Sequence, residues 1–232
     1  MATTTCTQIF RIYFCGDSKT TDKETVECCS LIAEPFGNAS VFLSSPSPFL
    51  SEEDARITRA TELLSQSILQ LHNCYKGKEA KKHPQRFILF TYGEGMKVVD
   101  LTLKKLLGHN IDIHVYSFGK TPTLIFYMLA RKVHHYIFQD HLTSQDAVLS
   151  RMHSIIQDVV EQEEEKSLSR YDTDFFNCEL MDHITKYERY FDSYSVTFLD
   201  KSDLEPSYDE TRCEFLAYAQ VIQEIAYAEC NL

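Results

Sequence analysis

The chain has 232 residues, of which 44% are hydrophobic, and its formal net charge is −11. A chain of this length can bury one sizeable core, so we expect a single domain over residues 1–232, with a helical C-terminal extension over residues 169–232 packed on it. The negative charge argues against nucleic acid or an anionic membrane surface as a partner, because phosphate contacts need clustered Lys and Arg. The basic cluster at residues 76–86 indicates a solvated linker.

The cysteines are scattered and form no C-x-x-C pair, which is typical of a reducing compartment and not of a disulfide framework. They are Cys6, Cys15, Cys28, Cys29, Cys74, Cys178, Cys213 and Cys230. The first residues lack the basic region and apolar core of a signal peptide, and no apolar run approaches transmembrane length. We therefore expect a cytoplasmic protein without membrane insertion, although the Ser/Thr-rich start would also suit export without a cleaved signal.

The first part of the chain alternates strand and helix patterns. Residues 9–15 mix β-branched and aromatic side chains and predict a strand, and residues 39–43 predict a second one. Between them, residues 19–36 predict a helix that ends at Pro35 to Gly37. Its predicted buried positions are Val26, Cys29 and either Ile32 or Ala33, with Leu31 at the edge of the same face. A longer amphipathic helix is predicted from Ser51, which has Asp54 three residues later in a capping-box pattern.

The rest of the chain is organised around residues 86–107. Residues 87–90 form a short apolar run with the length of a buried parallel strand. Gly93 and Gly95 then allow a tight turn at little steric cost. Apolar residues recur at helical spacing beyond the turn, and Gly108 closes the predicted helix. These apolar positions are Val98, Val99, Thr102, Leu103, Leu106 and Leu107.

Strands and helices continue to alternate after this segment. The further predicted strands are residues 111–118, 133–138 and 195–199. The further predicted helices are residues 123–131, a helix beyond Thr143, residues 174–191 and residues 209–230. Such alternation predicts the α/β class, as a three-layer sandwich with a mainly parallel sheet.

The strand, glycine turn and helix around residue 93 match the local architecture of a nucleophile elbow, the G-x-S-x-G turn of α/β-hydrolases. The serine position of that turn is Gly93, flanked by Tyr92, Glu94 and Gly95. Asp140 follows the fifth predicted strand and matches the triad acid. The loop after the last predicted strand contains no histidine to complete the triad.

Three segments resemble the lipase-like α/β-hydrolases, and more narrowly a group of uncharacterised chlamydial proteins with a lipase-like core. They are the elbow at residues 91–95, the strand end at residues 115–119, and Asp140. The resemblance covers roughly residues 9–208. It implies an α/β-hydrolase-like fold in a bacterial protein, with bacterial cytosol and export into a host cell both left open.

The residues that carry activity in those relatives are altered here. The relatives show T-H-S-E-G at the elbow, where this chain has Tyr92 and Gly93 in place of the histidine and the serine. Lys201 or Ser202 stands where their late histidine would fall. Deleting a serine nucleophile costs about 10⁶ in kcat, or roughly 8 kcal/mol. We therefore expect a pseudo-hydrolase, and the competing interpretation is a glycine-rich turn in an unrelated doubly wound protein.

An enzymatic alternative starts from Gly16-Asp17-Ser18, which follows the first strand as in GDSL-type esterases, with Ser18 as the nucleophile. Such enzymes also need a G-x-N-D block and a late D-x-x-H. The nearest candidates are Gly108-His109-Asn110 and Asp182-His183, whose spacing or surroundings do not fit.

Neither a metal nor a cofactor is expected. His134 and His135 point to opposite faces of a strand, so both cannot reach one ion, and Asp140 or His141 adds too few ligands. A phosphate cradle at residues 93–95 is unfavourable because Glu94 would repel the phosphate.

The last third of the chain is rich in acidic and aromatic residues. Such a surface suits a protein partner that is basic or apolar, while the aromatic residues also suit the core of a helical layer. We expect a protein-binding or scaffolding role, with the partner unidentified.

Overall fold

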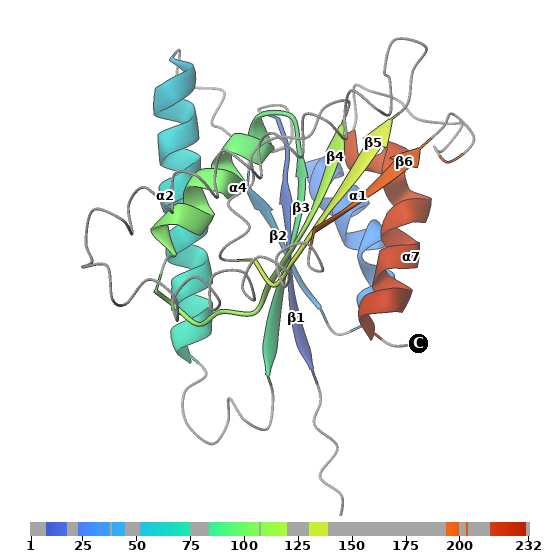
Figure 1. Cartoon of the computed structure of the whole chain (residues 1–232), viewed down its shortest axis with the longest axis horizontal. Helices are drawn as coiled ribbons and strands as arrows, with labels where there is room; N and C mark the ends of the chain where they lie inside the picture. Colours follow the sequence, from blue (N-terminus) through green and yellow to red (C-terminus); the bar gives the residue numbers. More distant parts are fainter. Residues whose placement is uncertain are drawn as a thin grey trace, which may run out of the picture.

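The computed structural model describes residues 8–17, 23–37, 39–44, 52–74, 84–106, 108–119, 130–138, 194–199, 203 and 214–230. Six strands form one sheet in which every neighbouring pair is parallel. The strands are β1 (Ile9–Cys15), β2 (Ser40–Ser44), β3 (Gln85–Tyr92), β4 (Ile113–Gly119), β5 (Lys132–Phe138) and β6 (Tyr194–Leu199). Their spatial order is β2-β1-β3-β4-β5-β6 (Figure 1).

Helices cover both faces of the sheet, as Figure 1 shows. The helical elements are α1 (Lys23–Ile32), η1 (Glu34–Phe36), α2 (Glu53–Cys74), α4 (Glu94–Lys105), η3 (Glu214–Tyr218) and α7 (Ala219–Cys230). One core cluster joins α2 and α4 to the sheet, and the other joins α1, η1, η3 and α7 to the opposite face. The α/β class is thus confirmed, with a C-terminal helix packed on an all-parallel sheet.

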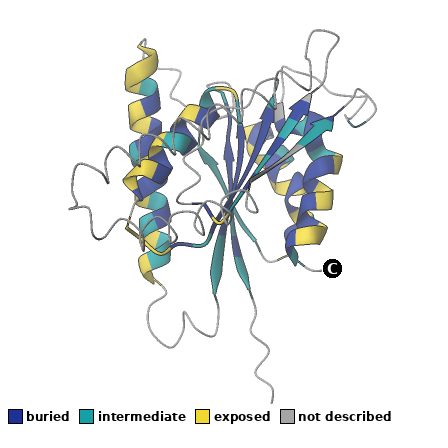
Figure 2. Ribbon diagram, viewed as in Figure 1, coloured by how far each residue is buried: buried dark blue, intermediate teal, exposed yellow. Residues whose placement is uncertain are grey.

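The central strands β1, β3 and β4 are buried on both faces, which is why they appear in the sequence as continuous apolar runs. In β4, Ile113 and Val115 face α2 and α4, whereas Tyr116 and Phe118 face the side of α7. Figure 2 shows dark, buried residues along the central strands and exposed residues on the outer sides of the helices. The two cores meet at the sheet, so the middle strands are held from both sides.

The direction in which successive strands are added to the sheet reverses once, after β2. From β1 it passes through α1 to β2 on one side, and from β2 it returns through α2 to β3 on the other side of β1. The connections that leave β1 and β3 therefore run to opposite faces. In open α/β sheets, ligands bind in the crevice that such a switch point creates at the carboxyl ends of the strands. Here that position lies between residues 16–17 and residues 93–95.

The predicted buried face of the first helix was right for Cys29, Ile32 and Ala33 and wrong for Val26 and Leu31, which are 44% and 69% exposed. Within α1, the buried positions are Thr25, Cys29 and Ile32. These three positions are spaced by four and three residues, so they form one stripe along the helix. The helix is also shorter than predicted: it ends at Ile32 and is followed by the 3-10 turn η1.

Three other predictions need correction. Arg86 was assigned to a solvated linker but lies in β3, where it forms two salt bridges. Of the residues in the helix predicted at 123–131, only Ala130 and Arg131 are described, and neither is helical; the backbone N–H of Arg131 donates to the carbonyl of Ile113 at 2.8 Å. In the described part of the helix predicted at 209–230, η3 is a 3-10 segment and the chain is α-helical from Ala219. The helices predicted beyond Thr143 and at residues 174–191 lie outside the described residues.

Candidate functional site

Residue 93 lies at the turn between β3 and α4, at the carboxyl edge of the sheet beside the end of β1. Gly93 has φ 54° and ψ −127°, a backbone conformation that side chains rarely tolerate. Its position before the first helical residue makes it the N-cap of α4, but glycine has no side chain with which to cap. The amino end of α4 therefore needs a hydrogen-bond acceptor from elsewhere.

Asp17 supplies that acceptor. Its Oδ1 accepts a hydrogen bond from the backbone N–H of Glu94 at 2.6 Å, across 77 residues of sequence. A Cβ atom added to Gly93 would overlap the Asp17 carboxylate. The carboxylate thus lies in the space into which a side chain at residue 93 would project. A negative charge at the start of a helix is also favoured by the helix dipole.

The first turn of α4 packs directly against the end of β1. A Cβ atom at Gly95 would overlap the backbone carbonyl oxygen of Cys15. Gly95 is not in the left-handed region, so the reason for glycine here is close approach and not backbone conformation. The two glycines of the turn are therefore required for different reasons: Gly93 for its backbone conformation and Gly95 for close approach. Both allow α4 to pack against the end of β1 and the residues that follow it.

The remaining side chains of the turn are engaged by neighbouring elements. Glu94 forms an ion pair with Arg56 of α2, with a nitrogen-to-oxygen distance of 3.0 Å. The ring of Tyr92 lies 6.3 Å from that of Tyr218 in η3, measured between centroids. The turn thus brings together Tyr92, Gly93, Glu94 and Gly95, while Ser18 and Asp140 lie outside the described residues. The catalytic or relic roles assigned to these positions stay predictions.

The sequence reasoning missed one serine–histidine contact. Ser117 of β4 and His135 of β5 are register partners, and Ser117 Oγ hydrogen-bonds His135 Nδ1. Burial and the neighbouring His134 lower the pKa of His135 to about 3, so its imidazole is neutral at ordinary pH. Ser117 is 2% exposed and His135 1% exposed, under the α2 and α4 face of the sheet. No substrate can reach this hydroxyl, so the pair is a buried contact between strands.

The prediction that His134 and His135 point to opposite faces is confirmed by their contacts. His134 stacks on Tyr136, with ring centroids 4.3 Å apart, on the face opposite to Ser117. The thiol of Cys15, at the end of β1, is completely buried, and this burial raises its pKa. A buried thiol with a raised pKa is a poor nucleophile.

A second group that sequence reasoning missed lies at the opposite, amino end of the strands. Glu229 of α7, only 5% exposed, accepts hydrogen bonds from Arg86 Nη1 at 2.9 Å and from the Tyr116 hydroxyl, and it contacts His114 Nδ1 at 2.8 Å. Asp112 accepts from Arg86 Nε at 3.1 Å. Arg86 thus joins the two carboxylates. We call these residues, together with Lys132 and Arg131, the Glu229 network.

The pKa values in this network follow from burial and hydrogen bonding. Burial opposes ionisation of Glu229, but hydrogen bonds from His114 and Tyr116 outweigh it and lower the pKa of this carboxyl to about 2. Burial likewise opposes protonation of His114, yet its contacts with the carboxylates of Asp112 and Glu229 raise the pKa of the imidazole. Because the network lies away from the carboxyl edge, it fastens α7 to the sheet and is not part of the crevice.

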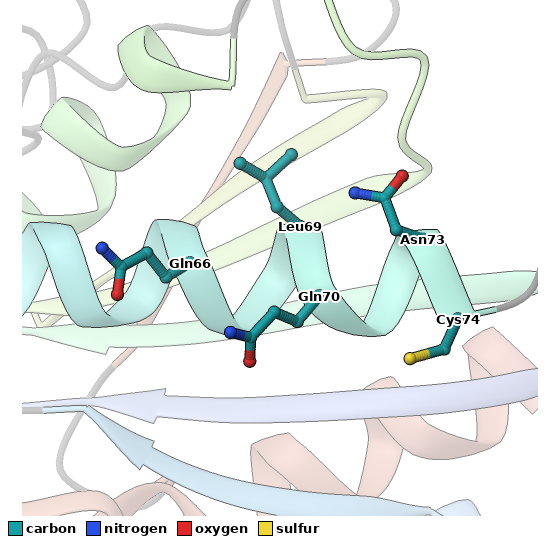
Figure 3. Close-up of a pocket in the computed structure, with 5 residues that line it drawn as sticks. All are labelled: Gln66, Leu69, Gln70, Asn73 and Cys74. Carbon is teal, nitrogen blue, oxygen red and sulfur yellow. The ribbon is translucent and has the colours of Figure 1, made fainter.

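Among the described residues, α2 and α4 line two hollows. One, of about 540 Å³, runs along the C-terminal half of α2 (Figure 3). The other, of about 330 Å³, lies between α2 and α4 and is lined by Thr58, Thr61, Leu101, Lys104 and Lys105. The described lining of the first is Gln66, Leu69, Gln70, Asn73 and Cys74. Neither described lining includes a residue of the turn at 93–95.

Within the described ranges, no three His, Cys, Asp or Glu side chains gather closely enough to hold a metal ion. The described helices are also all too short or too polar to cross a membrane. No family model, curated protein or solved structure matches the chain. The site must therefore be interpreted from its own geometry.

Proposed function

We propose that this chain is a non-catalytic pseudo-hydrolase that acts as a protein-binding or scaffolding module. The observation that carries the proposal is the position of the Asp17 carboxylate, which bonds Glu94 N at 2.6 Å and fills the space beside Gly93. In an active elbow that space belongs to the nucleophile. Here it is taken by a carboxylate of the same chain.

The amide that a hydrolase would use is also taken. An oxyanion hole needs backbone N–H groups that are open toward the developing negative charge. In this turn the N–H of Glu94, the residue after the nucleophile position, already donates to Asp17. A substrate oxyanion would have to displace a carboxylate of like charge. Residue 93 therefore offers no nucleophile, and one expected oxyanion donor is already used in a hydrogen bond to Asp17. Both features support a binding role.

Two features of the surface suit a protein partner: an exposed leucine and a high negative charge. Leu31 is 69% exposed on α1, and the chain carries a net charge of −11. A basic or apolar protein surface would complement these features. Nucleic acid is disfavoured by the same charge.

The catalytic half of the proposal is tested with p-nitrophenyl esters of several chain lengths. We expect wild type, Ser18→Ala and Gly93→Ser to show the same turnover, at the level of the uncatalysed reaction. The double variant Asp17→Ala with Gly93→Ser tests whether clearing the carboxylate admits a serine. Robust turnover by wild type that Ser18→Ala abolishes would instead establish the GDSL-type esterase alternative.

The binding half is tested separately by affinity capture from native lysate with wild type and Leu31→Ser, combined with light scattering. A specific partner or a defined oligomer supports the scaffolding role. A monomer that recovers nothing above background contradicts it, whatever the ester assay shows.

A further inference from the structure

The imidazole of His114 lies between two carboxylates at the junction of the sheet and the C-terminal helix. Its Nδ1 is 2.8 Å from Glu229 Oε1 on α7, and its Nε2 is 3.4 Å from Asp112 Oδ1. A neutral imidazole has one N–H, whereas the imidazolium has two. Only the protonated ring can donate toward both carboxylates at once. We propose that His114 is a protonation-linked latch that holds α7 to the amino end of the sheet.

Several groups of the Glu229 network surround His114 and hold the two carboxylates in place. Arg86 from β3 bonds both carboxylates and stays cationic at every ordinary pH. Lys132 of β5 lies 3.5 Å from Glu229, and Arg131 lies 3.7 Å from Asp112. Tyr116 donates to Glu229, and burial with this contact raises the pKa of its phenol far above neutrality. Burial also raises the pKa of Cys230, the next residue on α7.

His114 is the histidine of the network, and histidine is the side chain whose ordinary pKa lies closest to neutrality. The pKa of His114 is higher in the folded protein than in an unfolded chain. Protonated His114 therefore stabilises the fold fully at pH values below the ordinary pKa of histidine. This stabilisation is lost as the pH rises through the pKa of His114 in the folded protein. When the proton leaves, Glu229 and Asp112 compete for one N–H. The attachment of α7 then rests on Arg86, Lys132 and the apolar contacts of the helix.

The latch is tested by amide hydrogen exchange from about pH 6 to about pH 9, with each rate corrected for its intrinsic pH dependence. We expect the protection of α7 in wild type to fall severalfold with rising pH relative to α4, which packs on the opposite face. In His114→Gln the α7 to α4 ratio should be independent of pH. An unchanged pH profile in His114→Gln would overturn the proposal.

His134→Gln is the matched control. His134 is a half-buried histidine of the same sheet, and burial followed by the charge of Lys132 lowers its pKa to about 4, so it stays neutral over the range. This variant should keep the wild-type profile. If His114→Gln does not fold, the wild-type protein still decides the question by NMR titration of the His114 ring. A His114 pKa at or below that of histidine in an unfolded peptide overturns the proposal. A higher pKa, with the protection of α7 falling over the same pH range, supports the proposal.

Discussion

Close contact at a single backbone atom explains why residue 95 is glycine. The turn after β3 brings this residue against the carbonyl oxygen of Cys15, where a methyl group has no room. Both groups are backbone or backbone-linked, so neither can rotate away. Accommodating a side chain would require α4 to separate from the end of β1.

We expect Gly95→Ala to lower the free energy of unfolding by about 3 kcal/mol, the upper end of the cost of overpacking a close contact. An alanine inside a helix would otherwise stabilise it by roughly 0.5–1 kcal/mol. Gly108→Ala is the control, because a Cβ there meets nothing within 4 Å and only the φ of 87° opposes it, at about 1–2 kcal/mol. Urea unfolding measures both. A Gly95→Ala protein as stable as wild type would contradict the packing.

Asp17 and Gly93 should be energetically coupled. Gly93→Ala forces the new Cβ against the Asp17 carboxylate, while Asp17→Ala removes the clash together with the cap of α4. We expect the double variant to be about 1–3 kcal/mol more stable than the sum of the two single effects predicts. A double-mutant cycle by urea unfolding measures this coupling. Additive effects would show that the two residues do not share the space assigned to them.

At the scale of elements, α7 depends on one buried carboxylate as well as on apolar packing. Phe215 and Ile222 from η3 and α7 complete the core on one face of the sheet, and Glu229 contacts side chains of β3, β4 and β5 near the end of the same helix. A buried carboxylate with several cationic partners adds little net stability, but removing one partner is strongly destabilising.

Glu229→Gln should therefore destabilise the protein by about 3–5 kcal/mol, because it leaves Arg86 and Lys132 partly buried without their counter-charge. Glu224→Gln on the exposed side of the same helix should change stability by less than about 0.5 kcal/mol. Thermal or urea unfolding distinguishes the two. Equal effects for both variants would show that the network does not anchor the helix.

Local patterns predicted the strands to within about two residues, because strands buried on both faces are continuous apolar runs. The same patterns failed for the polar contacts. Arg86 and Glu229 are 143 residues apart, and Asp17 and Glu94 are 77 apart, so neither pair leaves a periodic signal in the sequence. The turn at residue 93 could be located in advance, but its occupation by Asp17 could not. The face of α1 was predicted only in part: Cys29 and Ile32 lie on the buried stripe, whereas Val26 and Leu31 lie beside it.

For the whole molecule, the Glu229 network predicts the response to acid. The folded pKa of about 2 lies below the ordinary value of 4.5, so the carboxylate stabilises the fold above pH 4.5 and that contribution is lost as pH falls toward 2. The pKa difference corresponds to about 3 kcal/mol. Urea unfolding at several acidic pH values should show a shallower loss of stability in Glu229→Gln than in wild type. Parallel pH profiles would contradict this assignment.

The position of Phe215 in the chain also bears on synthesis. Its ring packs 5.0 Å from Phe14 and 6.5 Å from Phe118, between centroids, so Phe215 shares a core with residues that are synthesised well before it. Until Phe215 has been synthesised, the aromatic surface of the emerging sheet has no cover from it. Nascent chains with such uncovered surface are prone to aggregate and are typical clients of chaperones. Premature termination before residue 215 should therefore yield insoluble fragments.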